Sequence, residues 1–147
     1  MLGRLESSHP YRYRVSLALT HPTLSAAELG TVLPVQPDHQ GTVGEPRKTP
    51  KGGPLPGTYR ESFWRHSFDT PQDANVEEFI AGLAETLSPS LPRLLSGGGK
   101  ARLFIGLFLQ QENIGLELSP ELMSRCGAVG ISLGFDIYGP DPSEGAA

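Results

Sequence analysis

Cysteine is almost absent from this sequence: Cys126 is the only one among 147 residues, so no disulfide can form within the chain. Such usage is typical of a reducing compartment. Long apolar runs are also missing. The first residues contain no stretch suited to a secretory signal, and nothing approaches the roughly 18 apolar residues of a membrane span. We therefore expect a cytoplasmic protein with no membrane partner.

Basic residues are few and scattered. The formal net charge is −4, with eight Lys and Arg against five Asp and Glu in residues 1–65, and four against eleven in residues 66–147. A protein that grips a phosphate backbone needs clustered Lys and Arg. Because the sequence has no basic stripe, we expect no nucleic acid partner.

Recognisable catalytic and metal-binding motifs are missing as well. The four histidines, Cys126 and the acidic residues show none of the close spacings that hold zinc, so we expect no metal and no cofactor. Gly97-Gly98-Gly99-Lys100 superficially suggests a phosphate-binding loop, but such a loop must open a helix, and here a strand-like segment follows. Cys126 falls on the apolar side of a predicted helix and is expected to be a core thiol.

Five segments have the pattern of strands. Residues 11–20 alternate between apolar and polar, which is typical of a strand with one buried face. Residues 59–68 are rich in aromatic side chains. Residues 100–109 are almost continuously apolar, which predicts a central strand covered on both faces. Residues 113–118 alternate again and are predicted to pair with 100–109 as a hairpin. The last predicted strand covers residues 131–138.

Three helices are predicted from their start signals. Ser25 and Glu28 fit the capping box, and Asn75 offers a second cap before apolar residues at helical spacing. Ser119-Pro120-Glu121 combines an N-cap, a proline at the first helical position and an acid near the positive end of the helix dipole. The inner face of this third helix is predicted to carry Leu122, Met123 and Cys126.

These elements follow the order β-α-β-α-β-β-α-β. The order favours an α+β fold in which helices pack on one face of a single, mostly antiparallel sheet. One domain is expected over residues 11–138, between a flexible N-terminus at 1–10 and a flexible tail at 139–147. Residues 34–58 contain six prolines and five glycines, so we predict one long loop inside the domain.

The C-terminal third resembles a known family. Residues 113–122 (NIGLELSPEL) and 130–138 (GISLGFDIY) are similar to the signature of the bacterial domain-of-unknown-function family 4279 (DUF4279), in which LSPEL opens a helix and the last strand ends in Asp-Ile-Tyr. Trp64 is similar to a tryptophan in the second strand of that family. The resemblance spans residues 11–138 and implies the same fold. Because the family has no assigned activity, the resemblance implies no catalytic residues.

The sheet face that the helices leave open is the predicted binding surface. Trp64 and Tyr138 are large amphipathic side chains of the kind enriched at interaction hot spots, although Trp64 fits a core position equally well. Glu117 and Asp136 lie outward on two predicted strands, either as a carboxylate pair with one raised pKa or as solvated charges. The predicted partner-binding residues are Arg12, Arg14, Trp64, His66, Glu117, Asp136 and Tyr138.

Three functions are compatible with this pattern. The first is a non-catalytic module that binds a partner protein, as an antitoxin-like immunity protein does when it covers the active site of a toxin. The second is a homodimer, formed by sheet packing or edge pairing, with a small-molecule pocket at its seam. The third and weakest is a hydrolase-type enzyme that uses the outer-face carboxylates, with His66 or Tyr138. We expect the first.

Overall fold

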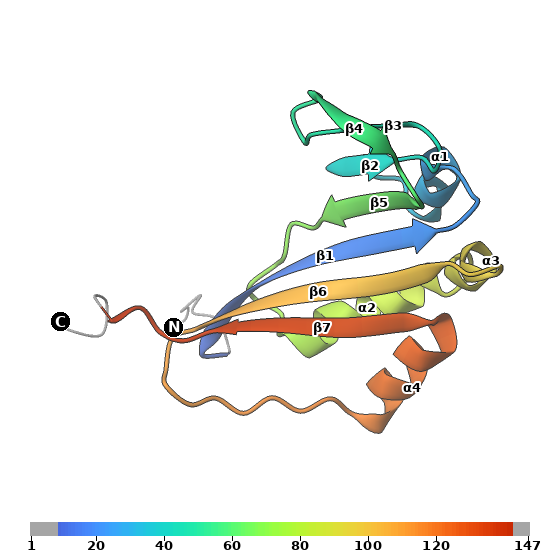
Figure 1. Ribbon diagram of the computed structural model, residues 1–147. Coiled ribbons are helices and arrows are strands. Elements are labelled where there is room, and N and C mark those ends of the chain that lie inside the picture. Colours follow the sequence, from blue (N-terminus) through green and yellow to red (C-terminus); the bar gives the residue numbers. More distant parts are fainter. Residues whose placement is uncertain (1–8, 143–147) are drawn as a thin grey trace.

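The computed structural model describes residues 9–142, and these form an α+β fold around one five-stranded sheet (Figure 1). Across the sheet, the strands are β2 (His39–Gly41), β5 (Ser62–Ser67), β1 (Tyr11–His21), β6 (Lys100–Leu109) and β7 (Ile131–Tyr138). Every neighbouring pair is antiparallel except β6 and β7, which are parallel. The predicted fold class is therefore confirmed. The predicted flexible ends fall largely on residues 1–8 and 143–147, outside the described part.

Helices cover one face of the sheet (Figure 1). They are α1 (Ala26–Leu29), which continues into the 3-10 turn η1 (Gly30–Val32), then α2 (Val76–Leu87), α3 (Leu91–Leu95) and α4 (Pro120–Val129). The predicted caps are confirmed: Ser25 and Asn75 form complete capping boxes, and the Ser119 hydroxyl accepts the amide hydrogen of Leu122. Within α4, Met123 is 52% exposed, so its predicted inner position is wrong, whereas Leu122 and Cys126 are buried.

The core lies between this face, here called the inner face, and the helices. Alternate residues of β1 and β6 point into it, and the apolar sides of α2 and α4 pack against these residues. Burial of side chains such as Leu17 and Leu103, both fully inaccessible, contributes roughly 1.5–3 kcal/mol each. The sheet therefore has one covered face and one face open to solvent.

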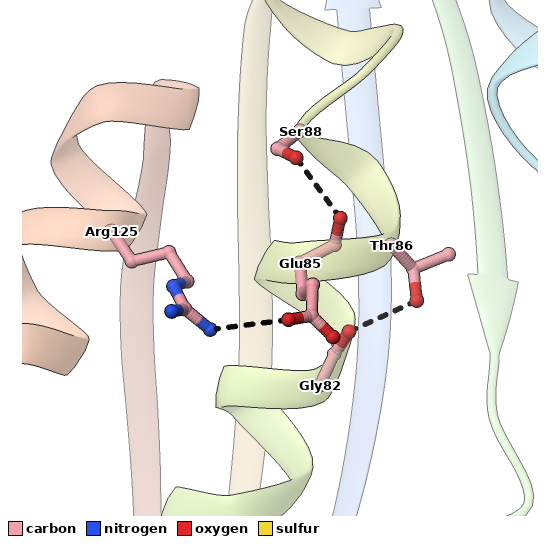
Figure 2. A network of polar contacts seen from close by, with 5 residues as sticks. All are labelled: Gly82, Glu85, Thr86, Ser88 and Arg125. Carbon is pink, nitrogen blue, oxygen red and sulfur yellow. Dashed lines mark hydrogen bonds and ion pairs between the residues drawn. The ribbon is translucent and has the colours of Figure 1, made fainter.

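Contacts between α2 and α4 extend to the surface of the helix layer. Figure 2 shows Arg125 of α4 reaching Glu85 of α2, with 3.8 Å between Nη1 and Oε2. The two side chains are 48% and 76% exposed, so this ion pair contributes at most about 1 kcal/mol. The hydroxyls of Thr86 and Ser88 donate to carbonyls of their own helix. The apolar core, rather than this network, holds the helices to the sheet.

The predicted hairpin of residues 100–109 and 113–118 is wrong. Residues 113–118 form no strand, and β7 occupies the edge of β6 in parallel. The segment instead runs back along the helix side toward α4 (Figure 1), where Ile114, Leu116 and Leu118 pack against the core. Its alternation therefore reflects an extended chain with one buried side, a pattern that arises without ladder hydrogen bonds.

Residues 34–58 are more ordered than one long loop. They contain β2, which pairs with β5, and a separate hairpin of β3 (Pro46–Lys48) and β4 (Pro54–Thr58). At the hairpin turn, the Thr49 amide donates to the Gly53 carbonyl at 2.7 Å and Gly52 takes φ +92°, which favours glycine.

In the part of the chain that is described, no helix is long and apolar enough to cross a bilayer.

Candidate functional site

The open face of the sheet, here called the outer face, is strongly basic. Strand alternation places five cations on it, Arg65 from β5 and the rest from β1 and β6, and Asp136 is the one acid among its strand positions. The strand residues of this face therefore carry a formal charge of +4, on a chain whose total charge is −4. The cations of the outer face are Arg12, Arg14, Arg65, Lys100 and Arg102.

Arginine and aromatic side chains lie against each other on β6 and β7. The Arg102 guanidinium lies 4.4 Å from the Phe104 ring centroid, within cation–π range. Gly134 of β7 leaves room for this arrangement, since a Cβ there would come within 2.9 Å of two Arg102 nitrogens. The absence of a side chain at Gly134 thus lets Arg102 lie flat across the neighbouring strand.

A hollow of about 530 Å³ opens on the outer face above Gly106. Gly106 pairs with Arg14 of β1 on one side and with Asp136 of β7 on the other, so a cation and an anion flank a floor without a side chain. Phe108 and Tyr138 stand at one end with their rings stacked, 5.0 Å between centroids and 7° from parallel. Arg14 and Asp136 form no ion pair within residues 9–142, which leaves both charges available to a ligand.

The wall of this hollow is the connection between β5 and α2. Because β5 ends at Ser67, the residues of β1 that precede Ser16 have no strand partner on the β5 side of the sheet. The Gln72 side chain takes the place of one: its Oε1 accepts the amide hydrogen of Tyr13 at 3.2 Å, and its Nε2 donates to the Tyr13 carbonyl at 3.1 Å. Thr70 donates to the same carbonyl at 2.9 Å. The connection is thus fixed along β1.

Tyr13 also holds this connection from the inner face. Its hydroxyl lies 2.7 Å from the Pro71 carbonyl oxygen and 2.9 Å from that of Ala74. Burial, reinforced by Tyr11, Asp73 and Glu78, raises the pKa of Tyr13 to about 12, so the hydroxyl remains a donor at neutral pH.

Four of the seven predicted binding residues lie on the outer face and are exposed, as the alternation of β1 and β7 indicates. These four residues are Arg12, Arg14, Asp136 and Tyr138.

Trp64 and His66 were predicted on the same face, and this prediction is wrong. They pair with Leu19 and Leu17, so they point toward the helices. Trp64 is 1% exposed and belongs to the core. His66 stacks on the Trp64 ring, and its Nδ1 lies 2.7 Å from the Gln36 carbonyl oxygen. Both side chains hold the inner layer together rather than facing a partner.

Glu117 does not join Asp136. Without the predicted hairpin, Glu117 lies in the extended connection before α4 and not on a strand beside β7. The carboxylate pair that a hydrolase mechanism required is therefore not formed by these two residues.

Sequence reasoning missed the contribution of β6. Its dense apolar composition predicted burial on both faces, yet Phe104 and Phe108 lie on the outer face together with Arg102. The signal was present in Lys100, Arg102 and Gly106, the non-apolar residues of the strand, which all fall at even-numbered positions and therefore on one face.

The structure also describes the surroundings of Cys126 and of the other side chains that could bind a metal. Burial raises the pKa of the Cys126 thiol, partly offset by Arg125, which disfavours the reactive thiolate. Within residues 9–142, no three His, Cys, Asp or Glu side chains gather in an arrangement that could hold a metal ion.

Comparison with known proteins identifies the family. No curated protein and no solved structure matches the chain. The model of a family described as "Domain of unknown function (DUF4279)" matches residues 9–140, a range that includes the whole sheet, all of its helices and the outer face. The resemblance seen at the C-terminal signature is thereby confirmed, and the chain belongs to the DUF4279 family.

Proposed function

We propose that this protein is a non-catalytic interaction module whose outer face binds an acidic surface of a partner protein. The observation that carries the proposal is the charge of +4 on the strand residues of an uncovered sheet face, in a chain with net charge −4. A potential concentrated on one face steers an oppositely charged partner and suppresses other encounters. Phe104, Phe108 and Tyr138 add aromatic surface beside the cations, the combination that is enriched at protein interfaces.

The role we propose for this module is that of an immunity protein in the cytoplasm, which inactivates its partner by covering the partner's active site. A rigid sheet suits such a role because its binding surface needs little ordering on association. The free, buried thiol of Cys126 is compatible with the reducing conditions of that compartment.

Two charge-reversal variants test the proposal. Arg65→Glu/Arg102→Glu reverses two cations of the outer face, whereas Arg93→Glu/Arg125→Glu makes the same change of total charge on α3 and α4. Each variant and the wild type are used to capture partners from a native lysate, and the mass of each eluted complex is determined. We expect one stoichiometric partner with the wild type and the helix variant, and its loss with the outer-face variant. Equal capture by both variants, or no stoichiometric partner at all, contradicts the proposal.

The alternative is a homodimer with a small-molecule pocket at its seam. Face-to-face packing of two copies would oppose two sets of strand residues that each carry a charge of +4, which is unfavourable. Edge pairing through β7 is better supported, because β7 ends the sheet, leaves Ile137 60% exposed, and leaves Tyr138, which lines the hollow over Gly106, 50% exposed. A dimeric mass in solution that becomes monomeric with Ile137→Lys would support this alternative, and a monomeric wild type at micromolar concentration would exclude it.

A further inference from the structure

Two hollows meet on the outer face along the N-terminal half of β1. One is the hollow over Gly106, and the other, of about 600 Å³, extends past Tyr13 toward Gln110. Arg14, Thr70 and Phe108 line both, so the hollows adjoin. We call the joined depression the β1 groove, and its defining residues are Arg12, Arg14, Thr70, Gln72, Gly106 and Phe108.

Two guanidinium groups lie along this groove at the spacing of an extended chain. Arg12 and Arg14 are both exposed on the same side of β1, and side chains two residues apart on a strand are separated by about 6.6–6.8 Å. An extended peptide presents its own alternate side chains at the same interval. Carboxylates at alternate positions of such a peptide would therefore match the two arginines, which form no ion pair within the described residues.

Acidic residues in the hollow over Gly106 set a second condition. Asp69 and Asp136 line this hollow together with Arg14, and Asp136 lies across Gly106 from Arg14. An unbroken run of phosphates would place negative charge against these carboxylates. A peptide can instead carry acids only at its centre and neutral or basic residues at both sides, so the charge pattern favours a peptide over a nucleic acid.

An aromatic platform lies next to the two arginines. Phe108 is 37% exposed and Tyr138 50% exposed, and the Arg14 guanidinium carbon lies 5.9 Å from the Phe108 ring centroid. Such a platform offers apolar contact to the side chains of a peptide that crosses it. The connection between β5 and α2 forms the opposite wall, and Thr70 and Gln72 hold it to the Tyr13 backbone by hydrogen bonds. The groove is therefore formed without a ligand.

We infer that the β1 groove binds an extended acidic segment of the partner protein, with carboxylates at alternate positions paired to Arg12 and Arg14. This inference rests on the proposed function, since it names the part of the partner that the outer face recognises. The hollow over Gly106 then receives a neutral or basic side chain beyond the acidic pair.

Two end-capped, fluorescent peptides of identical composition test the inference. In the first, Thr-Lys-Thr-Glu-Thr-Glu-Thr-Lys, the two glutamates are at alternate positions. In the second, Thr-Lys-Thr-Thr-Glu-Glu-Thr-Lys, they are adjacent and point to opposite sides of an extended chain. Fluorescence anisotropy gives the affinity of each for the full chain. We expect the first peptide to bind several-fold more tightly, and Arg12→Gln/Arg14→Gln to weaken it about tenfold, because exposed ion pairs each change an equilibrium a few-fold.

The matched control is Arg93→Gln/Arg125→Gln, which removes the same charge from α3 and α4 and should leave binding unchanged. Equal affinity for both peptides, equal loss with both variants, or tighter binding of single-stranded oligothymidylate than of either peptide overturns the inference. If the peptides fail but capture of a partner still depends on Arg65 and Arg102, only the groove assignment is wrong. If the peptides bind as expected but no partner is captured, the proposed function fails instead.

Discussion

The wall of the β1 groove depends on one side chain, Gln72, which makes the backbone hydrogen bonds that a neighbouring strand would otherwise make. Gln72 uses its Oε1 to accept the Tyr13 amide hydrogen, and its Nε2 lies within hydrogen-bond distance of the Tyr13 carbonyl, the Thr70 carbonyl and the Thr70 hydroxyl. The substitution Gln72→Glu keeps the shape and the acceptor, but it replaces the donor by a carboxylate oxygen that faces carbonyl oxygens.

At neutral pH this substitution loses the donated hydrogen bonds, about 1 kcal/mol each, and adds repulsion between like partial charges. We expect the free energy of unfolding to fall by about 2–4 kcal/mol. A protonated carboxyl can donate again, so the fold raises the pKa of the new acid. The loss should therefore shrink as the pH falls through that raised pKa, since the unfolded state binds the proton less tightly than the folded state does.

Urea denaturation at pH 7 and pH 4, with each variant compared to the wild type at the same pH, measures both effects. Gln111→Glu makes the same chemical change at an exposed site in the connection after β6 and should stay within about 0.5 kcal/mol of the wild type. If Gln72→Glu costs no more than this control at pH 7, or if its loss does not diminish at pH 4, Gln72 does not act as a substitute strand.

Two further predictions concern the assignment of faces and the stability at alkaline pH. Trp64→Ala should lower the free energy of unfolding by about 3–5 kcal/mol, whereas Ile137→Ala, at a side chain that is 60% exposed, should change it by well under 1 kcal/mol in the same denaturation assay; similar losses would contradict the burial of Trp64. Because the pKa of Tyr13 is raised to about 12, its contribution to stability should be fully present below pH 10 and be lost as the pH rises toward 12. Thermal unfolding across that range measures this loss, and Tyr13→Phe should make stability less dependent on pH. If the pH dependence is unchanged in Tyr13→Phe, other groups cause it.

Much of the fold follows from local patterns. The strict alternation of residues 11–20 predicts β1 and places Arg12 and Arg14 outside, because one buried face forces the polar residues to the other. The helix starts at Ser25, Asn75 and Ser119 follow from their capping chemistry, which acts within a few residues. These features need no knowledge of the rest of the chain.

Other features depend on contacts distant in the sequence. Alternation in β5 divides its residues between two faces, but only the pairing of Trp64 with Leu19 decides which face meets the helices. The pattern of residues 113–118 reports one-sided burial and cannot distinguish a strand from an extended segment packed on the core. The basic outer face was missed because its cations come from three strands that are far apart in sequence and adjacent only in the sheet.

Hydroxyl-radical footprinting of the captured complex tests most directly whether the outer face is the binding surface. Phe108 and Tyr138 are exposed on that face, while Met123 is comparably exposed on α4 and serves as the internal control. The proposed binding mode predicts that labelling of Phe108 and Tyr138 falls sharply when the partner is bound, while labelling of Met123 is unchanged. Protection of Met123 with continued labelling of Phe108 and Tyr138 would show that the partner binds the helix layer, and that the outer face is not the interface.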